Sequence, residues 1–195
     1  MEPPRSQLRL DPLEVSSSKQ VPGALIRRAT HSDARSIARV LVEAWRAAYR
    51  GILQTAFLDA MDIDTITNRW EHSLADQDIV AHPLVLVTGG QIVGFSHFGK
   101  PRDTADPCLG ELYALNVLPE VWGHGFGSQL LAAATDGLHK LGYTRAYLWV
   151  AAGNERASAL YERSGWKPSD SAKEDARFEP ALVEYRYERS LPVTH

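Results

Sequence analysis

The chain has 195 residues, of which 44% are hydrophobic and 23% charged, and its formal net charge is −3. This size and composition predict one globular domain with a substantial core, and the net charge argues against a nucleic-acid partner, because nucleic-acid-binding proteins usually show a basic face. The single cysteine, Cys108, excludes an internal disulfide and a multi-cysteine metal site.

The N-terminal residues 1–22 contain four prolines, a run of three serines and few large apolar side chains. Such a segment cannot bury enough surface to offset its ordering entropy, so we expect a flexible leader before a single domain at 23–195. No apolar run approaches the roughly 20 residues that cross a bilayer, and the N-terminus lacks the apolar centre of a secretory signal. We therefore expect a cytoplasmic protein without a membrane partner.

The domain is predicted to begin with a strand at 24–29 and a long helix. Thr30 and Asp33 have the spacing of a capping box, and apolar residues then recur every three or four positions until Gly51. Shorter helices are expected at 56–61 and 65–74. Two aromatic residues near the end of the long helix, Trp45 and Tyr49, are candidates for one wall of a substrate pocket; a stripe of core residues is the alternative.

The middle of the chain predicts an antiparallel meander. Residues 83–88 and 91–99 flank a Gly-Gly turn and read as a hairpin. A polar loop at 100–107 leads to a third strand at 109–118.

Three alternating glycines, Gly123, Gly125 and Gly127, connect that strand to a helix that ends near Leu141. Glycine allows the backbone to turn tightly against a ligand, and the start of a helix offers unpaired N–H groups and the positive end of its dipole. Together they predict a cradle for a pyrophosphate-bearing cofactor. The spacing matches neither the dinucleotide fingerprint nor the nucleoside-triphosphate loop.

The last third predicts a strand at 144–152, parallel to the 109–118 strand by a right-handed crossover. A helix capped by Asn154 follows, then a strand from Trp166, a charged loop at 169–180 and a last strand at 181–189. The predicted fold class is α/β, or α+β by some definitions: a mixed, mostly antiparallel central sheet of about six to seven strands with helices on both faces.

Two motifs in this order resemble the GNAT superfamily of N-acyltransferases. Its acyl-CoA loop reads Gln/Arg-x-x-Gly-x-Gly/Ala, and here Trp122 stands at the Gln/Arg position before Gly125 and Gly127. Its second motif is matched by Asn154, Ala157, Leu160, Tyr161, Gly165 and Trp166. The resemblance covers residues 24–189 and implies an N-acetyltransferase that moves an acetyl group from acetyl-CoA to a primary amine of a small molecule or peptide.

The resemblance also implies a set of acetyl-CoA-binding residues, which hold the pyrophosphate and the pantetheine arm. They are Leu115, Asn116, Val117, Trp122, Gly123, His124, Gly125, Phe126, Gly127, Ser128, Asn154 and Tyr161. A backbone N–H near Val117 is implied as the donor to the developing oxyanion.

The matching position makes Tyr161 the general acid that protonates the leaving thiolate; a tyrosine that only packs is the alternative. Glu111 is the candidate base, because the strand period of two places it on the same face as Tyr113, Leu115 and Val117; a surface carboxylate without a chemical role is the alternative. Some members of the family carry a base where this chain has Trp149, so that route is absent.

The acceptor side is less defined by the sequence. Candidate substrate-binding residues are Trp45, Tyr49, Glu111 and His97, the last also a second candidate base. Variable segments at 49–57, 100–107 and 169–180 are expected to select the acceptor, and the last is mildly acidic, which would suit a cationic amine. The histidines show no paired metal spacing, so no metal is expected.

The sequence leaves other functions open. The main one is a non-catalytic acyl-CoA-binding regulatory domain; a nucleotide-binding module is disfavoured by the glycine spacing. The resemblance also implies that the chain could form a homodimer.

Overall fold

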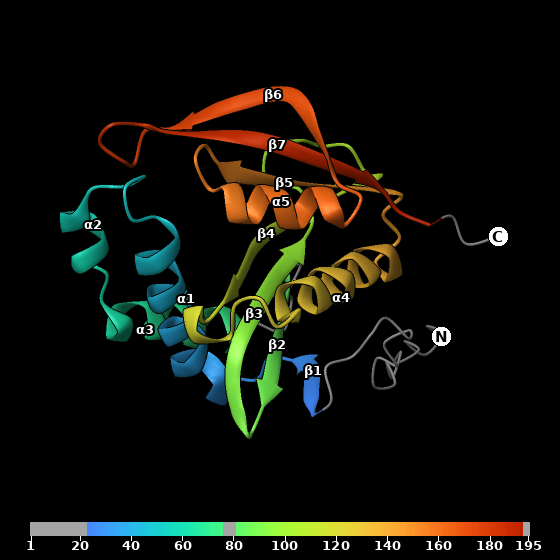
Figure 1. The fold of residues 1–195 in the computed structure, drawn as a ribbon. Helices are drawn as coiled ribbons and strands as arrows, with labels where there is room; N and C mark the ends of the chain where they lie inside the picture. Colours follow the sequence, from blue (N-terminus) through green and yellow to red (C-terminus); the bar gives the residue numbers. More distant parts are fainter. Residues whose placement is uncertain (1–22, 76–80, 193–195) are drawn as a thin grey trace, which may run out of the picture.

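The computed structural model describes residues 23–75 and 81–192, so the predicted leader at 1–22 lies outside the described residues (Figure 1). A seven-stranded sheet has the order β1-β2-β3-β4-β5-β7-β6. Its strands are β1 (Ala24–Arg28), β2 (Ala81–Thr88), β3 (Gln91–Gly99), β4 (Leu109–Val117), β5 (Arg145–Ala151), β6 (Lys167–Asp175) and β7 (Leu182–Ser190). Only β4 and β5 pair in parallel among these strands. The predicted mixed, mostly antiparallel sheet is confirmed.

Five α-helices and two 3-10 turns accompany the strands. They are η1 (His31–Asp33), α1 (Ala34–Ala48), α2 (Thr55–Asp59), α3 (Ile63–Ala75), η2 (Pro119–Val121), α4 (Phe126–Lys140) and α5 (Glu155–Arg163). The helices cover both faces of the sheet. Successive residues of a strand point to opposite faces, and in β2 Leu84 packs with α4 whereas Val85 packs with α1.

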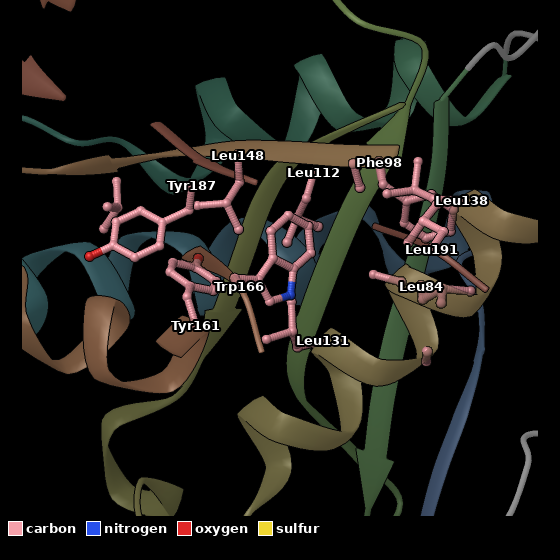
Figure 2. Packing of buried hydrophobic residues seen from close by; sticks show 14 residues of the cluster. Leu84, Phe98, Leu112, Leu131, Leu138, Leu148, Tyr161, Trp166, Tyr187 and Leu191 are labelled. Atoms are coloured by element: carbon pink, nitrogen blue, oxygen red, sulfur yellow. The ribbon is translucent and has the colours of Figure 1, made fainter. Parts of the chain in front are cut away.

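Helix α4 lies close to the sheet because small residues line its contact. A Cβ atom on Gly137 would come within 2.3 Å of the Phe98 ring, so only glycine permits this approach. In the same core cluster Trp166, 2% exposed, lies between Tyr161 of α5 and Leu131 of α4 (Figure 2). This packing fixes the position of Tyr161 relative to the sheet.

The prediction of a charged loop at 169–180 is wrong for the first half of this segment, because residues 169–175 belong to β6. This strand lies at the edge of the sheet and pairs with β7 (Figure 1). Most of its side chains are exposed on both faces, so the sequence lacks the apolar alternation that marks a half-buried strand. Its pairing places Lys173 opposite Glu184, with 3.4 Å between the ammonium nitrogen and the carboxylate.

No helix in the described part of the chain has the length and apolar character needed to span a membrane.

A buried carboxylate fixes the turn from β1 into α1. Asp33 accepts hydrogen bonds from the Arg27 guanidinium at 2.7 and 2.9 Å and from the Thr30 N–H at 2.7 Å, and the predicted capping box is present. The hydrogen bonds from Arg27, opposed by burial and supported by those from Thr30, lower the pKa of Asp33 to about 2.

We expect Asp33→Asn to lower the free energy of unfolding by roughly 2 kcal/mol at pH 7. Because the pKa in the folded state lies below the ordinary 3.8, this stabilisation is present above pH 4 and is lost as the pH falls towards 2. Urea unfolding at several pH values measures it. The control is Asp64→Asn, which removes an ion pair to Arg35 whose side chains are 70% and 73% exposed and which should cost less than about 1 kcal/mol. Equal losses in the two variants would contradict the prediction.

Candidate active site

Strands β4 and β5 separate halfway along their length. Their parallel pairing runs from Leu109 opposite Arg145 to Leu112 opposite Leu148 and then stops. On the other side of β4 the register with β3 shifts between His97 and Phe98, so that Tyr113 is an extra, bulged residue. A bulge bends its strand, and the second half of β4 therefore lies apart from β5.

The backbone of this half of β4 faces the gap at alternate residues. The Leu118 N–H donates to the Val93 carbonyl at 2.8 Å, so the neighbouring pair of Val117 and Gly94 is a non-hydrogen-bonded pair of the antiparallel ladder. The N–H and C=O groups of Val117, and by the same alternation those of Leu115, point away from β3. The Val117 carbonyl accepts the Trp122 indole N–H, and the other three groups face the side where β5 no longer pairs with β4.

A cavity of about 710 Å³ occupies this gap. The bulge interrupts strict alternation, yet Glu111, Tyr113, Leu115 and Val117 all line the cavity. Every predicted cofactor-binding residue lines it except His124, which is exposed and has its ring over Phe126.

Of the predicted substrate-binding residues, Trp45, Tyr49 and Glu111 line the cavity. His97 does not; its ring lies between those of Trp70 and Tyr113, with centroid distances of 5.1 and 5.0 Å.

The glycine segment that is predicted to hold a phosphate lines one part of the cavity. Gly125 precedes α4 with a φ of 84°, a left-handed conformation that favours glycine. The first hydrogen bond within the helix runs from the Gln129 N–H to the Gly125 carbonyl. The N–H groups of Phe126, Gly127 and Ser128 therefore have no partner within the helix and can bind an anion.

Trp122 connects this cradle to β4. Its indole N–H donates to the Val117 carbonyl at 2.8 Å, and its ring lies under the Arg156 guanidinium at 4.4 Å. Arg156 and Arg163 of α5 also line the cavity, so the cradle has positive charge beside its N–H donors. Neither arginine was among the residues predicted from the sequence. The available signal was that both belong to the helix that Asn154 caps.

Tyr161 lines the cavity and is 7% exposed. Burial, and secondarily the nearby Tyr49, raises the pKa of Tyr161 well above its ordinary value of 10, so its hydroxyl keeps its proton at neutral pH. Asn154 caps α5 by accepting the Ala157 N–H at 3.2 Å, as predicted, and it also lines the cavity.

The other end of the cavity is aromatic and charged. Trp45 lies 4.7 Å from Tyr49 and 6.4 Å from Phe178 between ring centroids. Burial first, and the charge of Glu184 second, raise the pKa of Tyr49 to about 12.

Glu111 is buried at this end, with its side chain 1% exposed. One oxygen accepts hydrogen bonds from the Arg102 side chain, and the other accepts the Arg102 backbone N–H and the Tyr147 hydroxyl, both at 2.9 Å. Four donors thus contact the two oxygens, and the ion pair anchors the loop at 100–107 to β4.

A second carboxylate, which the sequence analysis did not single out, comes from the same loop. Asp103 accepts hydrogen bonds from the Tyr147 hydroxyl and, at 2.9 Å, from the Trp149 indole N–H. Tyr147 and Trp149 are two residues apart on β5 and therefore face the same side. Nothing local in the sequence indicates which loop residue they hold.

Among the described residues, no group of three or more His, Cys, Asp and Glu side chains is placed to hold a metal ion. Cys108 is exposed and does not line the cavity.

Comparison with known proteins relates most of the domain to one family. The sequence profile of the acetyltransferase (GNAT) family matches residues 39–166. The chain is 30% identical over 125 residues to the uncharacterized N-acetyltransferase YuaI of Bacillus subtilis strain 168, a match that covers 64% of this chain and 70% of that protein. It is 38% identical over 85 residues to the mycothiol acetyltransferase of Pseudarthrobacter chlorophenolicus, covering 43% of this chain but about a quarter (26%) of that protein.

Solved structures share the fold. An N-acetyltransferase from Staphylococcus aureus Mu50 superposes with a TM-score of 0.68 at 24% identity, covering 87% of this chain and 99% of that one. The PaiA N-acetyltransferase from Thermoplasma acidophilum, solved in complex with coenzyme A, gives a TM-score of 0.69 at 18% identity, with coverages of 86% and 98%.

We expect Tyr147→Phe to destabilise the protein by about 1–3 kcal/mol, because it removes the hydroxyl that Glu111 and Asp103 share and leaves both carboxylates short of a donor. Urea unfolding measures the change. Tyr187→Phe is the matched control, since this buried tyrosine donates to a single carboxylate, that of Glu162, and should cost less. A larger loss for Tyr187→Phe would argue against the shared hydrogen bond.

Proposed function

Because the chain belongs to the acetyltransferase (GNAT) family, we propose that it transfers the acetyl group of acetyl-CoA to a primary amine of a small molecule or peptide. The observation that carries this proposal is one continuous cavity that joins the glycine cradle, the separated half of β4 and Tyr161. An acyl-CoA co-substrate needs these three features in this order, for its pyrophosphate, its pantetheine arm and its thioester.

The residues present fit acetyl-CoA. The N–H groups at the start of α4, with Arg156 nearby, suit a pyrophosphate. The outward-facing backbone groups of Leu115 and Val117 suit the amides of pantetheine, in the manner of an added strand. Asn154, beside them on α5, offers a side-chain amide to the same arm.

Two groups are proposed for the chemical step at the thioester. The Val117 N–H points into the gap and would donate to the oxygen on which negative charge develops. Tyr161 would donate its proton to the departing sulfur, and its raised pKa supports this role because the phenol stays protonated.

Glu111 is the proposed base that takes the proton of the attacking amine, directly or through water. Its burial at the cavity wall supports the role. Since four donors already contact its carboxylate, the incoming proton must displace or share one of these hydrogen bonds, and the Tyr147 hydroxyl, which also contacts Asp103, is the donor with an alternative partner.

The second candidate function is a non-catalytic acyl-CoA-binding regulatory domain. It would need the cradle but neither Tyr161 nor Glu111. A cytoplasmic location and a homodimer stay predictions from the sequence. The match to the mycothiol acetyltransferases covers only about a quarter of those proteins and therefore does not assign their acceptor to this chain.

We expect acetyl-CoA at a hundredfold its dissociation constant to stabilise the protein by roughly 2.7 kcal/mol in a thermal-shift titration, with NAD and ATP as controls. Gly125→Ala should weaken this shift, since its φ of 84° strains an alanine and moves the cradle. Gly142→Ala, with a φ of 92° at a glycine that does not line the cavity, should carry similar strain and keep the full acetyl-CoA shift. An absent shift in the wild type would refute the proposed function.

We expect Tyr161→Phe to lower kcat by about 10²-fold while acetyl-CoA affinity stays within about threefold. Because the protonated phenol is the active form and its pKa is raised, the wild-type rate should not fall on account of Tyr161 as the pH rises to about 10. Release of CoA thiol over a pH series measures both. Tyr187→Phe, next to Tyr161 at 6.0 Å but outside the cavity, should leave kcat unchanged. Full activity of Tyr161→Phe would favour another acid.

A further inference from the structure

The charges at the aromatic end of the cavity do not balance. Three cations line this wall, and each pairs with one carboxylate on the same wall. The pairs are Arg102 with Glu111, Lys173 with Glu184, and Arg177 with Asp175. A fourth carboxylate, Asp103, lines the wall and forms no ion pair within the described ranges. The wall therefore has one more carboxylate than cations, and the carboxylate without an ion pair is Asp103; the charges of Lys173 and Arg186 act on it from a greater distance.

Asp103 is held in place by neutral donors. The Tyr147 hydroxyl contacts one carboxylate oxygen and the Trp149 indole N–H contacts the other. Each oxygen has two lone pairs, so one on each oxygen is left for a ligand. Glu111 differs, because three N–H groups of Arg102 already contact its oxygens and it shares the single Tyr147 proton with Asp103.

The surroundings keep Asp103 in its charged form. Burial acts to raise the pKa of Asp103, but the hydrogen bonds from Tyr147 and Trp149 and the charges of Lys173 and Arg186 outweigh it, so this pKa lies below its ordinary value. The ammonium group of Lys173 already lies 4.3 Å from the Trp149 ring, which shows that this aromatic face accepts a cation.

We propose that Asp103 binds the ammonium group of the acceptor, and that the acceptor is a primary amine with an apolar substituent and no carboxylate beside its amino group. An amino acid carboxylate would meet cations that are already paired, together with the unpaired charge of Asp103. The apolar substituent has a surface to contact in Trp45, Tyr49 and Phe178. The proposal rests on the acetyltransferase function above and names the acceptor class of that site.

The test uses 2-phenylethylamine and L-phenylalanine, which differ by the carboxylate beside the amine. CoA thiol release is measured at saturating acetyl-CoA for wild type and Asp103→Asn. We expect the wild type to show at least a tenfold higher kcat/KM for phenylethylamine than for phenylalanine. We expect Asp103→Asn to raise the KM for phenylethylamine about tenfold, with kcat within about threefold, because asparagine keeps the size of the side chain and one of its two acceptor oxygens but loses the charge.

Two controls separate lost charge from damage. Asp106→Asn changes a carboxylate of the same loop that pairs with Arg145 and does not line the cavity, so KM should be unchanged. Lys173→Gln unpairs Glu184 and adds negative charge to the wall, so it should lower the KM for phenylethylamine. An increase of KM in Lys173→Gln as large as in Asp103→Asn would indicate damage to the wall and overturn the proposal.

Other outcomes also decide the matter. An unchanged KM in Asp103→Asn, a fall in kcat alone, or a wild-type preference for phenylalanine each overturns the ammonium site. So does a wild type that acetyl-CoA stabilises but that consumes neither amine. If acetyl-CoA fails to stabilise the wild type, the acetyltransferase function itself is refuted, and the two failures are thereby distinguished.

Discussion

The site depends on the point where two parallel strands stop pairing. Beyond Leu112 and Leu148 the backbone of β4 has no neighbour in β5, and unpaired backbone groups are costly unless another donor or acceptor reaches them. Trp122 satisfies the Val117 carbonyl and leaves the Val117 N–H directed into the gap. The bulge at Tyr113 thus leaves a gap in the sheet along the second half of β4.

The two ends of the cavity differ in the sign of their charge. At the start of α4, unpaired N–H donors lie near Arg156 of α5, and Arg163 of the same helix also lines the cavity. At the far end, three ion pairs cancel and one carboxylate is left over. Tyr161 lines the same cavity, and burial raises the pKa of its hydroxyl so that it keeps its proton. A mixed cavity of this kind can hold a polyanionic co-substrate and a cationic acceptor without either occupying the other's end.

Much of the fold could be predicted from local sequence, since the long helices and the inner strands bury one face and therefore show a period. Strand β6 could not, because it is an edge strand whose only requirement is the backbone pairing that β7 offers. The cradle was also predictable: its glycines are needed for a backbone conformation, Gly125 at a φ of 84°, and that need appears directly in the spacing. In the periodic elements and in the glycine segment alike, the pattern that allows the prediction lies in residues that are neighbours in sequence.

The contacts at the aromatic end of the cavity could not be predicted from local sequence. Asp103 meets Tyr147 and Trp149 across more than 40 positions of the chain, and the ion pair of Arg102 with Glu111 connects a loop to a strand. Neither contact has a period or a spacing, because each depends on how the loop at 100–107 lies over β5. The sequence indicated Trp149 as a position without a base; the fold brings a carboxylate to its indole N–H from another segment. Glu111, Tyr147 and Trp149, which hold this loop, all lie outside the glycine segment before α4, so the loop and that segment are held by separate contacts.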